Sequence, residues 1–320
     1  MNYMRLTSLA AALCLSLSAF AAQAEPVNFL FASSGELATL HDKLARSDIA
    51  GVQVVYNWKN LEKGKGEYDF SAIEADLAYV QKMDKKLFIQ IQDRFFEPTA
   101  KNVPAYLMTA PEYKGGIVPQ VDNPGQGKAP AMGWVAQQWN PAVQKRYQAL
   151  LKALAARFDG KVYGVNLPET AIDIDQKHDK TGFSCDRYFN AEVQNMQVAR
   201  SAFQKSLVVQ YVNFWPCEWD NDHQYMSRLF AFAANNHIGL GGPDVVPYKK
   251  GQMKNAYPFF NRYKGKLPVV AMAIQEPTLT YTNPKTHKPF SKQEITDFAT
   301  SYLGADLLFW TPETPWLKQH

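Results

Sequence analysis

Eight short apolar runs are the feature that most constrains how this 320-residue chain can fold. Each is four to seven residues long, and most consist almost entirely of apolar side chains. Such near-continuous apolar character is typical of parallel strands that are covered on both faces. We therefore expect buried strands at residues 27–32, 51–56, 86–92, 162–167, 207–212, 237–240, 268–274 and 305–310.

Helical patterns separate these runs, and the alternation predicts a (β/α)8 TIM barrel. The expected helices cover residues 34–46, 71–83, 141–158, 190–204, 222–234, 257–262 and 291–302. Only ten residues follow Trp310, so the eighth helix should be short or missing. A doubly wound open sheet is the alternative fold, although no glycine-rich turn follows the first strand to support it.

One connection is too long to be a passive linker. Residues 93–140 show no clear periodicity and are rich in glycine and proline. A segment of this length in a compact domain is expected to have a structure of its own. We expect it to fold over one face of the core, ending at Asn140 and Pro141, which are suited to the cap and first position of a helix.

The first 24 residues have the pattern of a cleaved export signal. Arg5 precedes an apolar run over 6–20, and Ala22-Gln23-Ala24 forms a small-residue cleavage site before Glu25. The run is too short to span a bilayer as a stable helix. We therefore expect a signal peptide at 1–24, a single barrel domain at 25–320, and a periplasmic or secreted protein.

Charge and cysteine content agree with this assignment. The formal net charge is only +4 and is spread without blocks, which does not favour nucleic acid or a membrane surface as a partner. After cleavage, Cys185 and Cys217 are the cysteines that remain. An oxidising compartment permits a disulfide between them, which would stabilise the fold by roughly 3–4 kcal/mol. Two unpaired buried thiols are the alternative. We expect a monomer.

Glu169 is the first candidate for a catalytic role. It follows the apolar run 162–167 directly after Pro168, which cannot donate to a strand ladder and so ends the strand. A carboxylate beside a buried strand is costly unless something uses it. Catalytic residues of TIM barrels lie at these carboxyl ends of strands.

Glu276 occupies the matching position two residues after the seventh run. Two carboxylates at the mouth of a barrel suit glycoside hydrolysis, in which one acts as a proton donor and the other attacks the anomeric carbon. Burial and mutual repulsion would separate their pKa values. The plainer alternative is that Glu169 caps a helix and Glu276 forms a surface ion pair. Glu313, beyond the eighth run, is a rival partner.

Several motifs resemble the clan A retaining glycoside hydrolases, a TIM-barrel superfamily. Residues 58–62 (WKNLE) and 65–70 (KGEYDF) are similar to its "W…lEp…G.ydfs" run after strand two, and Phe309-Trp310 to its sugar-stacking tryptophan. The resemblance implies that Glu169 is the acid/base and Glu276 the nucleophile. Many members have Asn immediately before the acid/base, where this chain has Pro168, with Asn166 two residues earlier.

The tryptophans favour a carbohydrate cleft. All seven follow a predicted strand, on the side that carries the carboxylates, and aromatic rings stack on the apolar faces of sugars. Trp134 and Trp139 are instead expected to pack the long segment. Arg94 could orient a carboxylate, or pair with Asp93 or Glu97 to brace the loop. The expected substrate-binding residues are Trp58, Arg94, Asn166, Asn213, Trp215, Asp244 and Trp310.

These patterns predict an exported retaining glycosidase that cleaves a β-linked oligo- or polysaccharide and is endo-acting. The six histidines are scattered without ligand spacing, and neither a nucleophile elbow nor a phosphate loop occurs, so we expect no metal and no cofactor. The alternatives are a non-catalytic periplasmic glycan-binding barrel, and a polysaccharide lyase or transglycosylase that uses the same cleft.

Overall fold

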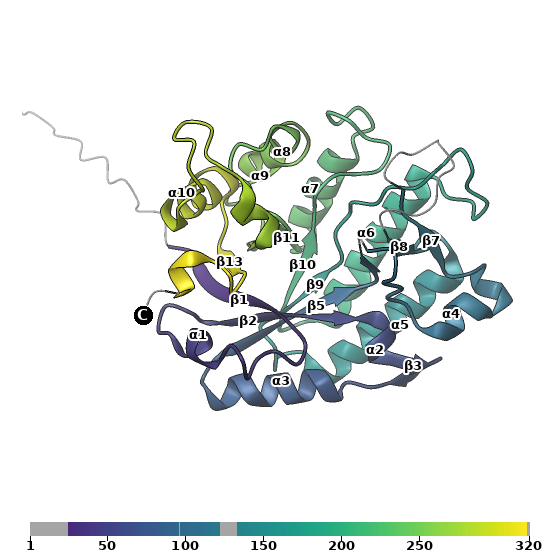
Figure 1. Ribbon diagram of the computed structural model, residues 1–320. Helices are drawn as coiled ribbons and strands as arrows, with labels where there is room; N and C mark the ends of the chain where they lie inside the picture. Colours follow the sequence, from purple (N-terminus) through teal and green to yellow (C-terminus); the bar gives the residue numbers. More distant parts are fainter. Residues whose placement is uncertain (1–24, 96, 122–132, 319–320) are drawn as a thin grey trace, which may run out of the picture.

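Eight parallel strands close into a barrel in the computed structural model, which describes residues 25–95, 97–121 and 133–318 (Figure 1). The order around the barrel is β1-β13-β12-β11-β10-β9-β5-β2, and parallel pairing of β1 with both β13 and β2 closes it. The strands are β1 (Val27–Ser33), β2 (Gly51–Asn57), β5 (Lys86–Gln92), β9 (Gly164–Leu167), β10 (Leu207–Tyr211), β11 (Gly239–Gly242), β12 (Val270–Ile274) and β13 (Leu307–Trp310).

The predicted TIM barrel is therefore confirmed, and the open sheet is excluded. All eight apolar runs form barrel strands, because each is buried between the barrel interior and the surrounding helices. The sixth strand differs most from its prediction: it begins at Gly239 rather than at residue 237. His237 has a positive φ of 54°, which places it in the turn before the strand.

Helices surround the barrel, with α3, α5, α6 and α7 outside the strands that they follow or precede (Figure 1). They are α1 (His41–Ala45), α3 (Ser71–Lys82), α5 (Pro141–Phe158), α6 (Cys185–Ala202), α7 (Tyr225–Asn235), α8 (Lys250–Asn255), α9 (Tyr257–Arg262) and α10 (Lys292–Asp297), which continues into the π-helical η3 (Phe298–Leu303). A single 3-10 turn, η4 (Pro315–Lys318), follows β13 among the described residues, as expected for a vestigial eighth helix.

The first helix is much shorter than predicted. The pattern over 34–46 is helical only at α1, and turns occupy the residues before it. Gly35 there has a φ of 88°, and no side chain caps the start of α1. The predicted start of α5 is confirmed, since the Asn140 side chain accepts a hydrogen bond from the Ala142 amide and Pro141 follows it.

The long segment has structure of its own, as predicted, and its described part includes a small antiparallel sheet. Its strands pair in the order β6 (Arg94–Phe95), β8 (Trp134–Ala136), β7 (Ile117–Pro119), and α4 (Ala105–Thr109) and η1 (Pro111–Tyr113) precede β7. A short helix and hairpin follow β2: α2 (Trp58–Leu61), β3 (Glu62–Gly64) and β4 (Glu67–Tyr68). These elements lie together on one side of the barrel (Figure 1).

The predicted disulfide is present. Cys185 begins α6, Cys217 lies in the loop after β10, and their Cα atoms are 6.3 Å apart. The predicted signal peptide lies outside the described residues. Within the described part of the chain, no helix has both the length and the apolar character needed to cross a bilayer.

Two apolar layers form the core. Side chains inside the barrel include Phe29, Phe88, Val209 and Phe309, and the larger layer lies between the strands and the helices. Bulky interior rings need small residues opposite them. Strand β11, with the sequence Gly-Leu-Gly-Gly, supplies these: a Cβ on Gly241 would lie 3.0 Å from the ring of Tyr211 and only 1.9 Å from the carbonyl oxygen of Ala271 on the neighbouring strand.

We expect Gly241→Ala to lower the free energy of unfolding by about 1–3 kcal/mol or more, because the neighbouring strand backbone would have to move. Urea unfolding followed by circular dichroism measures this. The matched control is Gly251→Ala in α8, where an added Cβ meets no atom within 4 Å. It should be neutral or stabilising by up to about 1 kcal/mol. Equal effects at both positions would contradict the close-approach argument.

Candidate active site

A pocket of about 240 Å³ lies at the carboxyl ends of the barrel strands. We call it the mouth pocket. It is lined by residues from or just after seven of the eight strands: Phe31, Val55, Gln90, Gln92, Glu169, Tyr211, Pro243, Asp244, Gln275 and Pro277. This is the end of a TIM barrel at which catalytic groups gather. The position predicted for the site from strand ends is therefore a hollow that contains several polar side chains.

Glu169 is held in the mouth pocket by a pair of amides. Asn213, in the loop after β10, donates from Nδ2 to Glu169 Oε2 at 3.2 Å, and the Gln252 amide of α8 donates in turn to Asn213 Oδ1. Burial raises the pKa of Glu169 to about 7; the Asn213 hydrogen bond opposes this rise, and the charge of Asp244 adds to it. A carboxyl with this pKa is partly protonated near neutral pH and can serve as a proton donor.

Asp244 is the carboxylate coupled to Glu169. It follows β11, lines the same pocket and is half-buried. Burial raises its pKa, the Lys249 cation lowers it, and the negative charge of Glu276 raises it. The charge of Asp244 thus affects the pKa of Glu169, and the charge of Glu276 affects the pKa of Asp244. This agrees with the strand order, in which β11 lies between β9 and β12.

Glu276 begins η2 (Glu276–Thr280), two residues after β12. Its side chain is exposed, and Oε1 accepts a hydrogen bond from the Thr311 hydroxyl after β13. The residues on either side of it, Gln275 and Pro277, line the mouth pocket. The two predicted glutamates thus lie at the same end of the barrel, Glu169 inside the pocket and Glu276 at its edge.

Buried amide side chains lie on the strands that form this pocket. Gln90 and Asn166 are register partners on β5 and β9, and Tyr211 donates to Gln53 Oε1 at 3.0 Å. Gln53 Nε2, Gln90 Oε1 and Asn166 Oδ1 are buried without a hydrogen-bond partner among the described residues. Orphaned buried amides are costly, and a ligand hydroxyl or a water molecule that reached the Gln90 oxygen would satisfy it. Of these three residues, Gln90 is the one that lines the pocket.

Arg94 is not positioned to bind substrate. It is fully buried, and its guanidinium donates to Asp93 Oδ1 at 2.7 Å, to the Tyr188 hydroxyl at 2.6 Å and to Glu192 Oε1 at 3.3 Å. It also donates to the backbone oxygen of Glu169 at 2.7 Å. The structure therefore favours the bracing alternative, including the pairing with Asp93, and Arg94 supports the backbone of the candidate acid.

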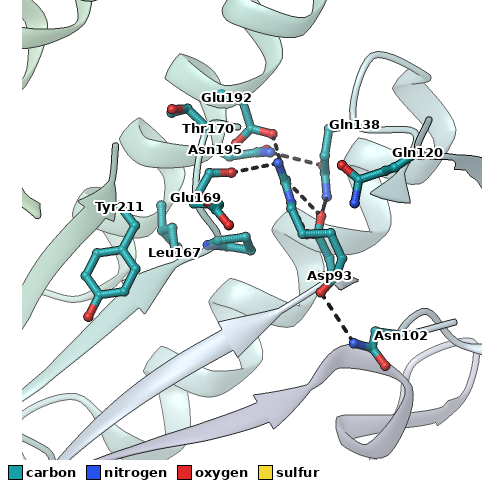
Figure 2. A network of polar contacts seen from close by, with 12 residues as sticks. Asp93, Asn102, Gln120, Gln138, Leu167, Glu169, Thr170, Glu192, Asn195 and Tyr211 are labelled. Atoms are coloured by element: carbon teal, nitrogen blue, oxygen red, sulfur yellow. Dashed lines mark hydrogen bonds and ion pairs between the residues drawn. The ribbon is translucent and has the colours of Figure 1, made fainter. Parts of the chain in front are cut away.

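The Arg94 network extends into α6, as Figure 2 shows for the labelled side chains around Glu169. Gln138 donates to Asp93 Oδ2 at 2.7 Å, and Asn195 donates to Gln138 Oε1 at 3.1 Å. Glu192 has a pKa raised to about 7 by burial, which the charge of Arg94 opposes. Two buried carboxylates thus share one cation.

The tryptophans expected to bind sugar are mostly in the core. Trp58, Trp215 and Trp310 are buried, and the indole of Trp58 donates to Glu62 Oε2 while that of Trp310 donates to Asn28 Oδ1. Asn166 is also fully buried and donates to the backbone oxygen of Leu167. A residue after a strand can turn back into the core, and large rings gain most from doing so. These four residues do not line the mouth pocket.

Asn213 and Asp244 are the expected binding residues that lie at the site. Sequence reasoning missed Gln90, Gln92, Tyr211, Gln252 and Thr311. The first two carried a usable signal, because glutamines alternate with apolar residues in the run Lys86–Gln92 and period two places them on one face of the strand. Gln252 on α8 had no such signal. Glu313 is mostly exposed and paired with Lys318 at 2.8 Å. Within the described ranges, no group of three or more His, Cys, Asp or Glu side chains is arranged to hold a metal ion.

Comparisons with known proteins give the fold. No protein-family model matches the chain, and no curated protein matches its sequence. Among solved structures it is similar to the catalytic domain of β-amylase from Paenibacillus polymyxa, with a TM-score of 0.57 and 10% identity over 90% of this chain and 93% of that one. Endo-glycoceramidase II from Rhodococcus sp. gives 0.54 and 11% over 92% and 78%, and a xylanase from Cellvibrio japonicus gives 0.52 and 12% over 92% and 89%.

The chain therefore has the TIM-barrel fold shared by these glycosidases. The resemblance that the sequence motifs indicate is confirmed at the level of the fold.

We expect Arg94→Met to lower the free energy of unfolding by about 3–5 kcal/mol, because it leaves Asp93 and Glu192 buried without their cation. Arg157→Met is the control: Arg157 pairs with Glu74 at the surface, and its loss should cost less than about 1 kcal/mol. Chemical denaturation of both variants measures the difference. Similar losses in the two would show that the buried network does not stabilise the fold.

Proposed function

We propose that this chain is an exported retaining glycoside hydrolase acting on a β-linked glycan, with Glu169 as acid/base and Glu276 as nucleophile. The proposal rests mainly on the position and burial of Glu169. It is a carboxyl at the end of β9, inside the mouth pocket, with a pKa raised to about 7 by burial. Export rests on the pattern of residues 1–24 and agrees with the disulfide.

The first half of the reaction would use both glutamates. Protonated Glu169 gives its proton to the glycosidic oxygen while the bond from that oxygen to the anomeric carbon breaks. A carboxylate oxygen of Glu276 forms a bond to the anomeric carbon, and the leaving sugar departs with a new hydroxyl. The hydrogen bond from Thr311 to Glu276 Oε1 fixes the orientation of that carboxylate.

The second half would regenerate both groups. Ionised Glu169 takes a proton from water, and the water oxygen displaces Glu276 from the anomeric carbon. Asn213 can stabilise the charged form of Glu169 between the two steps, since its amide donates to that carboxylate. One structural neighbour is described as a lactosyl–enzyme intermediate, which is the kind of covalent species this scheme requires.

The substrate proposed is an oligo- or polysaccharide cleaved internally. Gln90, Gln92 and Tyr211 give the mouth pocket polar groups that suit sugar hydroxyls. A second pocket of about 380 Å³ shares Val55 with it, and a third of about 470 Å³ includes Asn213, the partner of Glu169. Room on both sides of the acid favours endo-action.

We expect wild-type protein to release new reducing ends from β-linked glycans, and Glu169→Gln and Glu276→Gln to lower kcat by at least about 100-fold, because each loses a step of the reaction. Reducing-end assays on a glycan panel measure this. Glu112→Gln, at an exposed carboxylate paired only at 4.0 Å with Lys65, is the control. NMR of the first product should show a retained anomeric configuration.

Other outcomes discriminate the alternatives. Glycan binding without cleavage by wild type would indicate a non-catalytic barrel, and unsaturated products would indicate a lyase. Products longer than the substrate would indicate transglycosylation. Cleavage that persists in Glu276→Gln would remove Glu276 as nucleophile.

We also expect kcat/KM to fall as pH rises through about 7, because the proton donor is lost as Glu169 ionises. The charge of Asp244 raises the pKa of Glu169, so Asp244→Asn should move this alkaline limb to lower pH. The pH profile of kcat/KM measures both effects, with Glu112→Gln again as the control. An alkaline limb that Asp244→Asn leaves in place would contradict the coupling between the two carboxyls.

A further inference from the structure

A pocket near the mouth pocket combines an exposed tryptophan with several polar side chains. It has a volume of about 470 Å³ and lies between the loop after β10 and helix α8. We call it the Trp219 pocket. The residues that matter here are Asn213, Trp219, Lys249 and Gln252, all of which line it.

The exposed indole is its first distinguishing feature. Trp219 is 57% exposed, whereas Trp58, Trp215 and Trp310 are buried. Exposing so large an apolar ring has a free-energy cost that a ligand stacked on it would remove. The Lys254 ammonium lies 5.0 Å from the centre of the ring and occupies one of its faces. The side chain is nevertheless more than half exposed, so much of its surface is open to a partner.

The loop that carries Trp219 is held in place. Cys217, two residues earlier, is tied to the start of α6 by the disulfide. The Trp219 amide donates to Asp222 Oδ1 at 3.0 Å, and Glu218 accepts hydrogen bonds from the first amides of α7. Glu218 is therefore occupied as a helix cap. The indole is presented by a braced loop, which lowers the entropy that binding would cost.

The Trp219 pocket is contiguous with the candidate acid. Asn213 lines the Trp219 pocket and also donates to Glu169. Lys249 lines it as well, and its charge acts on Asp244 in the mouth pocket. Gln252 fixes Asn213 from the α8 side. An extended ligand bound at Glu169 could therefore continue past Asn213 to the indole of Trp219.

We propose that the Trp219 pocket is a subsite for a pyranose unit of the same glycan chain whose glycosidic bond lies at Glu169. The apolar face of the sugar would stack on the exposed indole, and its hydroxyls would meet the amides of Asn213 and Gln252 and the Lys249 ammonium. This combination of one aromatic face with several polar groups is typical of sugar sites. The inference rests on the proposed glycosidase function for its choice of ligand.

The test compares Trp219→Ala with wild type on β-1,4-linked xylo- and gluco-oligosaccharides, from disaccharide to hexasaccharide. The ratio of kcat/KM for the longest over the shortest substrate should fall about tenfold in Trp219→Ala, since a lost aromatic contact costs about 1.4 kcal/mol. Trp219→Phe should restore part of the ratio. An unchanged ratio in Trp219→Ala overturns the proposal.

Tyr248→Ala is the matched control. Tyr248 is 46% exposed on the neighbouring loop but does not line the Trp219 pocket, so its loss should leave the ratio unchanged. Thermal unfolding of each variant checks that the fold is intact. An equal fall of this ratio in Tyr248→Ala would also overturn the proposal, because the effect would then not be specific to the Trp219 pocket.

A binding measurement separates this proposal from the proposed function. In Glu169→Gln, calorimetry with the hexasaccharides should give a Kd about tenfold weaker when Trp219→Ala is added. If wild type cleaves none of the panel but this difference persists, the glycosidase function fails while the subsite stands. If wild type cleaves the glycans but Trp219→Ala changes neither the kcat/KM ratio nor the Kd, the subsite fails while the function stands.

Discussion

A buried arginine is the interaction on which the candidate site depends. Arg94 is fully enclosed, and burying a cation is expensive unless every donor is used. Its donors reach Asp93, Tyr188, Glu192 and the backbone oxygen of Glu169. The position of the candidate acid is therefore set from behind by a charged network rather than by the barrel strand alone. A catalytic group needs such support to be held at the required geometry.

The carboxyl groups at the barrel mouth form a series of decreasing burial. Glu169 lies in the pocket, Asp244 is half-buried beside it, and Glu276 is exposed at the edge. Charge is least well solvated at the Glu169 end, so the proton is held there. A two-carboxylate reaction requires one protonated and one ionised group, and the difference in burial between the two predicted partners favours such a pair. Asp244 adds a further charge between them.

Much of this architecture could be predicted from the sequence, for physical reasons. The strands are buried on both faces, so their apolar runs are unambiguous, and Asn140-Pro141 marks a helix start through a local hydrogen bond. Placing Glu169 and Glu276 at strand ends required no more than that. Chain position after a strand does not determine exposure, however. Trp58, Trp215 and Arg94 follow barrel strands and Trp310 ends one, yet all four fill the core, because tertiary packing decides which way such a side chain turns.

Helix α6 connects features that are distant in the sequence. Its first residue, Cys185, is bonded to the loop that carries Trp219, while Tyr188 and Glu192 contact Arg94 behind the candidate acid. One helix therefore connects the loop of the exposed indole to the residues that support the candidate acid. The consequence is a dependence on cellular compartment: in a reducing cytosol, where the thiols stay apart, the barrel would keep its acid but lose the tether that fixes how far away the indole stands.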